Sequence, residues 1–200
     1  RRVPCNDPVH QPPSVTITTM KAAATKKNVK SADRALQAPV MFRTANDLPK
    51  PARVKLIALL NARSADTIDL HTQMKQAHWN VKGPNFIGLH ELFDKIHAST
   101  DGYVDTIAER AVQLGGVAEG TVRSSAKRTH IPEYLHGIAD GAAHVDAVTA
   151  ALAAFGHEVR ESIDQADDLE DADTADIFTE VSRGIDKWLW FVEAHAQAAK

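Results

Sequence analysis

The chain has 200 residues and a mass of 21.7 kDa, which suits one sizeable domain or one domain with a tail. No apolar stretch approaches the roughly 18 residues of a membrane-spanning helix, and no N-terminal segment has the pattern of a secretory signal. A membrane-spanning protein is therefore excluded, and we expect no classical secretion. The single cysteine, Cys5, excludes an internal disulfide framework and fits a cytoplasmic protein.

The net charge of −3 hides a strong asymmetry along the chain. Residues 1–50 hold nine Lys and Arg against three Asp and Glu, whereas residues 51–200 hold 14 against 23. The two segments therefore carry charges of about +6 and −9. An acidic body should repel DNA, while a basic arm should attract it.

Residues 1–50 are predicted to form a flexible basic arm. They contain most of the prolines, few large apolar side chains, and no sustained period of a helix or a strand. Met20, which several lysines follow, is a candidate for the natural start of the chain.

Residues 51–114 predict two long helices. From Pro51 onward, apolar side chains recur every three to four positions until Gly83-Pro84 ends the pattern. A second helix is expected from Asn85, as its N-cap, to Leu114, where Gly115-Gly116 supplies the stop.

The rest of the chain predicts a crossover and two more helices. Residues 117–135 are irregular and are expected to hold one short helical turn. Helices are then predicted over about 136–165 and 174–198. With no alternating strand pattern, residues 51–200 predict an all-α fold: an up-down four-helix bundle whose long crossover carries a short helix.

The second predicted helix carries two spaced pairs of metal-ligating side chains. His90 and Asp94 lie one turn apart, and so do Asp105 and Glu109. The eleven residues from Asp94 to Asp105 return to within about 20° of the same direction, so all four side chains share one stripe. Imidazole combined with carboxylate suits Fe, Mn or Zn.

These two pairs cannot serve one ion within one chain. About 16 Å of helix separates them, whereas ligands lie near 2 Å from a metal. Two copies packed antiparallel about a two-fold axis near Ser99-Thr100 would join the first pair of one chain to the second pair of the other. His78, near the end of the first helix, is a candidate to complete each site. Solvated surface pairs remain the alternative that periodicity alone leaves open.

Three motifs carry a resemblance to a known family: QAHWNVKGP at residues 76–84, LHELFD at 89–94, and Asp105 followed by Ala108-Glu109-Arg110. With their spacing, His-x11-His-x3-Asp-x10-Asp-x3-Glu, residues 50–198 resemble the Dps (DNA protection during starvation) branch of the ferritin-like proteins. The resemblance implies a ferritin-like bundle, a hollow homo-dodecamer, and a ferroxidase centre with two irons at each two-fold interface.

The resemblance also implies roles for five residues. Asp105 and Glu109 of one subunit and His78 of its neighbour would hold the first iron, while His90 and Asp94 complete a weaker second position. The enzyme would oxidise Fe(II) with hydrogen peroxide and store Fe(III) inside the shell. By contrast, the Glu-x-x-His motif at residues 133–136 falls in a predicted loop, and we interpret it as chance.

Residues 161–180 contain nine acids and no Lys or Arg. One interpretation is a solvated turn whose acids, Asp171 among them, stabilise the N-terminus of the next helix. The other, from the resemblance, is an acidic ring around a three-fold pore that includes Asp167 and Asp176. One expected acidic position of that ring falls on Ala172.

The arm is a candidate DNA-binding segment, because its cations can contact phosphates without sequence preference and twelve copies would add avidity. Its candidate residues are Lys21, Lys26, Lys27, Lys30 and Arg34. A merely solubilising tail is the alternative. We expect a cytoplasmic, nucleoid-associated protein; the alternative function is a structural DNA-compacting protein with minor ferroxidase activity.

Two further histidines lie near the predicted site. His71 is seven residues before His78 and shares its face, where a solvated or core role is expected. His97 falls close to the stripe of ligands and is a candidate for a supporting role around the metal.

Overall fold

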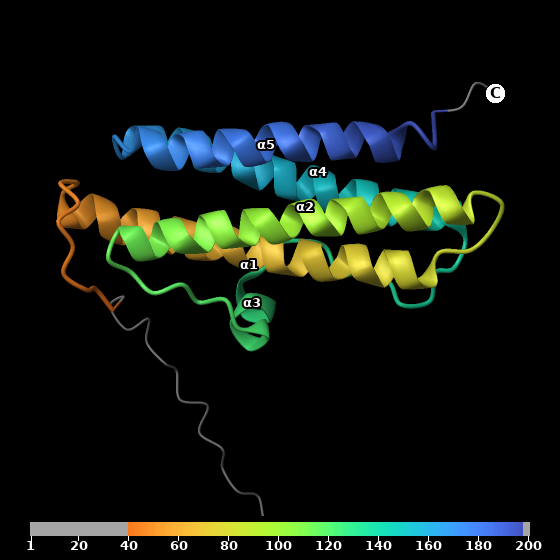
Figure 1. Ribbon diagram of the computed structural model, residues 1–200, viewed down its shortest axis with the longest axis horizontal. Coiled ribbons are helices and arrows are strands. Elements are labelled where there is room, and N and C mark those ends of the chain that lie inside the picture. The colour runs from red at the N-terminus through yellow and green to blue at the C-terminus, as the bar shows by residue number, and fades with distance from the viewer. Residues whose placement is uncertain (1–39, 198–200) are drawn as a thin grey trace, which may run out of the picture. The chain divides into compact units, whose positions relative to one another are not determined.

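The computed structural model describes residues 40–197, and this part of the chain is helical without a strand (Figure 1). The basic arm with its five candidate DNA-binding residues lies outside the described residues. The predicted all-α bundle of four long helices, with a short helix in the crossover, is confirmed in this part of the chain. The helices are α1 (Lys50–Asn80), α2 (Phe86–Gln113), α3 (Val122–Arg128), α4 (Gly141–Asp168) and α5 (Ala172–Glu193).

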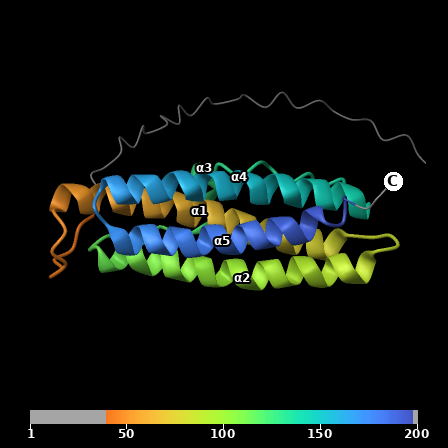
Figure 2. The ribbon, with the colours of Figure 1, turned by 90° about the horizontal axis from the view of Figure 1, so that it is seen from above.

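The four long helices form two antiparallel hairpins, α1 with α2 and α4 with α5. The crossover of residues 114–140 returns along the bundle, so that α4 runs in the same direction as α2 (Figures 1 and 2). Within this arrangement α1 contacts α2, α3 and α4, while α2 also contacts α5. The short helix α3 therefore lies against α1, in the crossover that the sequence predicted.

The end of α2 is held by a glycine that no other residue replaces easily. Gly115 has a φ of 87°, a left-handed conformation that favours glycine. A Cβ at this position would also lie 2.8 Å from the carbonyl oxygen of Phe42. The same turn receives a hydrogen bond from the Phe42 N–H to the Gly115 carbonyl at 2.7 Å, and one from Arg53 to the Leu114 carbonyl at 3.0 Å.

The start of α4 differs from the sequence-based prediction by five residues. The helix begins at Gly141 because the Asp140 carboxylate accepts hydrogen bonds from the N–H groups of Ala142 and Ala143 at 3.1 and 3.3 Å. The preceding segment is fixed elsewhere: the Lys82 N–H donates to the Ala139 carbonyl at 2.9 Å. A helix from residue 136 would break this link between the α1–α2 turn and the crossover.

The ends of α5 also differ from prediction. The helix begins at Ala172, two residues early, because Asp171 caps it through the Thr174 N–H. It ends at Glu193 rather than near residue 198. Turns follow over residues 194–196, where the chain has passed the core and no packed face supports another helical turn.

The core lies between the two hairpins. Phe93 of α2, Phe155 of α4 and Phe178 of α5 are each fully buried, together with aliphatic side chains of α1 such as Leu60 and Met74. Burying three phenylalanines contributes about 5–9 kcal/mol before the entropy of ordering is subtracted. This core fixes α1 against α2, and with them the candidate metal ligands.

No helix in the described part of the chain has a stretch long and apolar enough to cross a membrane.

Candidate metal centre

The imidazole of His78 in α1 and the imidazole of His90 in α2 each hydrogen-bond to the backbone carbonyl of the other residue. The Nδ1 atom of His78 lies 2.8 Å from the His90 carbonyl oxygen, and the Nδ1 atom of His90 lies 2.8 Å from the His78 carbonyl oxygen. The rings stack with centroids 3.6 Å apart and an interplanar angle of 23°. Two of the five predicted ligands are therefore in contact within one chain.

This exchange of hydrogen bonds prepares both imidazoles for a metal. A carbonyl oxygen can only accept, so each Nδ1 carries the proton and each Nε2 presents its lone pair. Ligating histidines usually have this kind of support. Because the stacked rings lie almost parallel, their in-plane Nε2 lone pairs do not both point at one ion.

Asp94 brings the first carboxylate to the histidine pair. Its Oδ1 lies 3.9 Å from His78 Nδ1, and the same oxygen forms an ion pair with the ammonium group of Lys75. The hydrogen bond from Lys75 holds the pKa of Asp94 below its usual value. Asp94 is thus a charged carboxylate at neutral pH, and a metal ion must compete with Lys75 for it.

Asp105 and Glu109 lie further along α2, and both are exposed. Four helical turns from Asp94 to Glu109 place them beyond the reach of an ion held by the histidine pair. Within the described residues, none of the five predicted ligands belongs to a group of three whose donor atoms lie within 4.8 Å of one another. One chain therefore presents two separated halves of the predicted ligand set.

A second histidine pair lies on the same two helices. His71 Nδ1 is 3.2 Å from the His97 carbonyl oxygen, His97 Nδ1 is 3.0 Å from the His71 carbonyl oxygen, and the ring centroids are 3.8 Å apart. Burial, followed by the proximity of His97, lowers the pKa of His71, so its imidazole is neutral at pH 7. The sequence placed His71 on the face of His78 but did not predict this pairing.

A different cluster does bring three metal-type side chains together: Asp66 of α1, His130 of the crossover and Glu158 of α4. Arg63 lies among them, 3.0 Å from Asp66 and in an ion pair with Glu158. The guanidinium thus already supplies the positive charge that these acids need, and we assign the cluster a structural role. A charged residue in the apolar stripe of the first predicted helix was the signal that could have revealed it.

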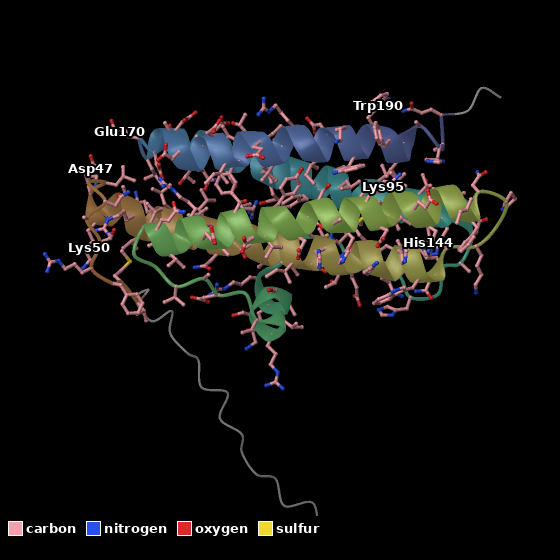
Figure 3. The ribbon with its side chains drawn as sticks, in the orientation of Figure 1. Asp47, Lys50, Lys95, His144, Glu170 and Trp190 are labelled. Carbon is pink, nitrogen blue, oxygen red and sulfur yellow. The ribbon has the colours of Figure 1, made fainter. Side chains whose placement is uncertain are left out.

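The acidic stretch divides into a structural part and an exposed part. Asp171 is buried, caps α5, and accepts a hydrogen bond from Arg110 at 2.7 Å. Asp167, near the end of α4, and Asp176, in the first turns of α5, are both exposed. Figure 3 shows Glu170 at the α4–α5 turn between them. The capping role thus holds for Asp171, although this carboxylate is buried and not solvated, and the other two carboxylates are exposed to solvent or to another subunit.

Trp79 of α1 and Trp190 of α5 are not core residues of the single chain. Trp79 is 68% exposed and Trp190 is 62% exposed, on the outer side of α5 (Figure 3). The aromatic ring next to the histidine pair is Phe86, whose centroid lies 5.0 Å from that of His90.

Comparisons with known proteins agree with the fold and the motifs. A family model described as a ferritin-like domain matches residues 57–200. The DNA protection during starvation protein of Agrobacterium fabrum is 45% identical over 155 residues, which cover 78% of this chain and 96% of that protein.

Two solved structures show the same architecture. DpsA14 of Streptomyces coelicolor superposes with a TM-score of 0.77 at 31% identity, covering 81% of this chain and 96% of that one. The Dps of Microbacterium arborescens, solved in a high iron form, has a TM-score of 0.70 at 32% identity and covers 78% and 99%.

The four-helix bundle with its long crossover and the family match define this chain as a ferritin-like protein. Within that class it belongs to the Dps family.

Proposed function

We propose that this protein is a ferroxidase that stores and detoxifies iron, oxidising Fe(II) at sites shared between two subunits. Each site would combine His78, His90 and Asp94 of one chain with Asp105 and Glu109 of the neighbour. Iron is the substrate, and two ions bind per site before oxidation. Family membership supports the iron-storing role, and the ligand geometry supports the shared site.

The observation that carries the proposal is the pairing of His78 with His90. Their Nδ1 atoms are engaged at 2.8 Å, which leaves the Nε2 atom of each ring as a donor, and the Asp94 carboxylate lies 3.9 Å from His78 Nδ1. Three donors from one chain leave each ion short of ligands. The exposed Asp105 and Glu109 would be the matching half, and an antiparallel two-fold axis near residues 99–100 would bring the halves together.

Binding the irons in pairs would avoid the release of hydroxyl radicals during oxidation. Two Fe(II) ions supply two electrons, hydrogen peroxide takes them with two protons, and the products are two Fe(III) ions and two water molecules. Neither electron is left to form a hydroxyl radical. The carboxylates of Asp94, Asp105 and Glu109 stabilise the product, because hard oxygen donors favour Fe(III).

The storage step needs a closed assembly, and we propose a homo-dodecamer built from these two-fold dimers. Asp167 and Asp176 would line a three-fold pore where their negative field concentrates Fe(II). Their exposure at the ends of α4 and α5 supports this placement.

We also propose that the basic arm binds DNA nonspecifically through Lys21, Lys26, Lys27, Lys30 and Arg34, which would associate the protein with the nucleoid in the cytoplasm. The charge of about +6 on residues 1–50 supports this, as does the name of the relative from Agrobacterium fabrum. Deletion of residues 1–35 should abolish a mobility shift of DNA at low salt. Undiminished binding would contradict a role for the arm.

The ferroxidase proposal is tested by peroxide-driven Fe(II) oxidation under anaerobic conditions. His78→Ala and Asp105→Ala should each lower the rate by about 10- to 100-fold, because each removes a donor from one half of the site. Glu91→Gln is the matched control: Glu91 is exposed on α2 next to His90 but is not a proposed ligand. Unchanged rates in both alanine variants would overturn the proposal.

Mixing the two inactive variants tests whether the site is shared. In a dimer of one His78→Ala chain and one Asp105→Ala chain, one site carries both defects and the other carries neither. Random co-assembly should therefore restore about a quarter of the sites. If each site lay within one chain, mixing would restore none.

A further inference from the structure

The helix α2 exposes a large apolar side chain near each of its ends. Ile87 is 63% exposed in the first turn, and Val112 is 55% exposed in the last turn. A single exposed apolar side chain is common on a protein surface and needs no explanation. These two are informative because of their position relative to the proposed metal ligands.

Both residues lie on the stripe of α2 that carries the four proposed ligands of this helix. Ile87 precedes Asp94 by seven residues, and Val112 follows Asp105 by seven residues. Seven residues return to within about 20° of the same direction on a helix. The ligand stripe therefore begins and ends with an apolar side chain.

The two apolar ends are placed symmetrically about the axis that the ligand spacing requires. Ile87 lies 12 residues before Ser99, and Val112 lies 12 residues after Thr100. An antiparallel two-fold axis between Ser99 and Thr100 would place Ile87 of each chain opposite Val112 of the other, twice in a dimer.

The two ends also differ in shape. A hollow of about 430 Å³ lies beside Val112, open to solvent and lined also by Ala108, Glu109, Gln113 and Ala118. At the other end, Ile87 projects into solvent. A projecting and a hollowed end on one stripe fit a two-fold contact, because each chain supplies both and each meets its counterpart.

Between these ends the stripe is acidic. Glu91 and Asp101 lie on it together with the proposed ligands Asp94, Asp105 and Glu109. Two copies would bring these carboxylates face to face, and like charges across an interface repel. Without a metal, the attraction between two such surfaces has to come from the apolar ends.

We propose that this stripe is a self-complementary docking surface for a second copy of the chain, in which Ile87 of each chain lies in the hollow beside Val112 of the other. The apolar ends set the register, so that His90 meets Glu109 of the partner chain before iron binds. The proposal rests on the proposed function in taking the two-fold axis from its ligand spacing. It adds that residues outside the ligand set hold the two chains together and that this contact forms without metal.

Disulfide trapping in metal-free protein tests the register. The single cysteine is replaced by Cys5→Ser, and Ile87→Cys and Val112→Cys are then introduced together. With EDTA present, oxidation by diamide should convert at least half of the chains to covalent dimers on a non-reducing gel. Within one chain the two positions are about 37 Å apart along α2, so they cannot bridge each other.

Variants with a wrong register or a wrong face are the controls. Ile87→Cys alone and Val112→Cys alone should give no covalent dimers, because neither residue faces its own copy. The matched pair is Ile87→Cys with Thr106→Cys, since Thr106 is also exposed on α2 but points about 120° away from Val112. Equal yields of dimer in the matched pair and the test pair would overturn the proposal, as would a test pair that gives no dimers.

A charge pair tests the same contact without a covalent bond. Ile87→Lys alone and Val112→Asp alone should each raise the dissociation constant of the dimer at least tenfold, because each puts a charge into an apolar contact. Together they place an ammonium group opposite a carboxylate twice in each dimer, so sedimentation should show recovered assembly. Assembly in the double variant as weak as in the single variants, or weaker, would overturn the proposal. The ferroxidase proposal fails on a different measurement, the peroxide-driven rate of the Asp105→Ala variant.

Discussion

The guanidinium group of Arg110 lies 2.7 Å from the carboxylate of Asp171, and both side chains are buried. Arg110 also donates to the Thr174 hydroxyl at 3.0 Å. The contact joins the last turn of α2, next to the proposed ligand Glu109, to the turn between α4 and α5. A buried ion pair thus fixes the metal-binding helix against the acidic end of the bundle.

Arg110→Ala should therefore destabilise the protein by about 3–5 kcal/mol, because it leaves Asp171 as an uncompensated buried charge. Chemical unfolding at pH 7 measures this loss. Adding Asp171→Asn should recover at least about 1 kcal/mol, since asparagine can still cap α5 and carries no charge. A loss below 1 kcal/mol in the single variant would show that the ion pair does not hold the turn.

Lys75 occupies the Asp94 carboxylate before any metal does, and this competition is measurable. The pair is partly exposed, with side-chain accessibilities of 26% and 49%, so it is worth about 0.2–1 kcal/mol. Lys75→Met should strengthen Co²⁺ binding at the proposed ferroxidase site by up to about five-fold. The matched control is Lys95→Met, because Lys95 is exposed on α2 and forms no ion pair among the described residues. Weaker binding in Lys75→Met would mean that the lysine supports the site.

The long helices were predictable because their signals are local. Apolar periodicity and the punctuation by Gly83-Pro84 and Gly115-Gly116 gave α1 and α2 to within a few residues. The start of α4 was not predictable in this way. Apolar residues before Asp140 extended the helical pattern, whereas the hydrogen bond from Lys82 to Ala139 joins segments far apart in the chain.

The candidate site also combines features that local sequence patterns predict with features that they do not. Spacing placed His71 and His78 on one face of a helix, and the ligand set of the ferroxidase site remains a prediction from spacing and resemblance. The exchange of Nδ1 bonds depends on the register between α1 and α2, which no local pattern encodes. Likewise, Arg63 stood out as a charge in an apolar stripe, but its partner Glu158 is 95 residues away.

Gly184 of α5 is required by a close approach of Tyr103 from α2. A Cβ at position 184 would overlap the Tyr103 hydroxyl and lie 2.9 Å from its Cζ. Gly184→Ala should therefore cost about 1–3 kcal/mol through overpacking. Gly88→Ala is the control, because nothing lies within 4 Å of a Cβ there and alanine favours a helix by up to about 1 kcal/mol. Thermal unfolding should separate the two, and Tyr103→Phe should relieve part of the loss in Gly184→Ala.

Glu158 should make stability depend on pH through Arg63. The hydrogen bond from Arg63 lowers the pKa of Glu158, while burial raises the pKa of Asp66 in the same cluster. A carboxyl whose pKa falls on folding stabilises the protein above its unfolded pKa, near 4.5, and loses that contribution as the pH falls through the folded pKa. Glu158 therefore stabilises the folded state at pH 7, whereas Asp66 acts with the opposite sign.

Glu158→Gln isolates the first of these effects, because Asp66, His130 and His157 remain in both proteins. At pH 7 the variant should be less stable by about 1.5–3 kcal/mol, the range for a hydrogen bond to a charged group. The difference from the parent should shrink as the pH falls below 4.5, where Glu158 of the unfolded parent becomes protonated, and it should be lost once the pH falls through the lower pKa of the folded state. Urea unfolding at pH 7, 5 and 3.5 measures it. If the difference in stability stays constant over this pH range, Glu158 acts through packing and not through its ion pair with Arg63.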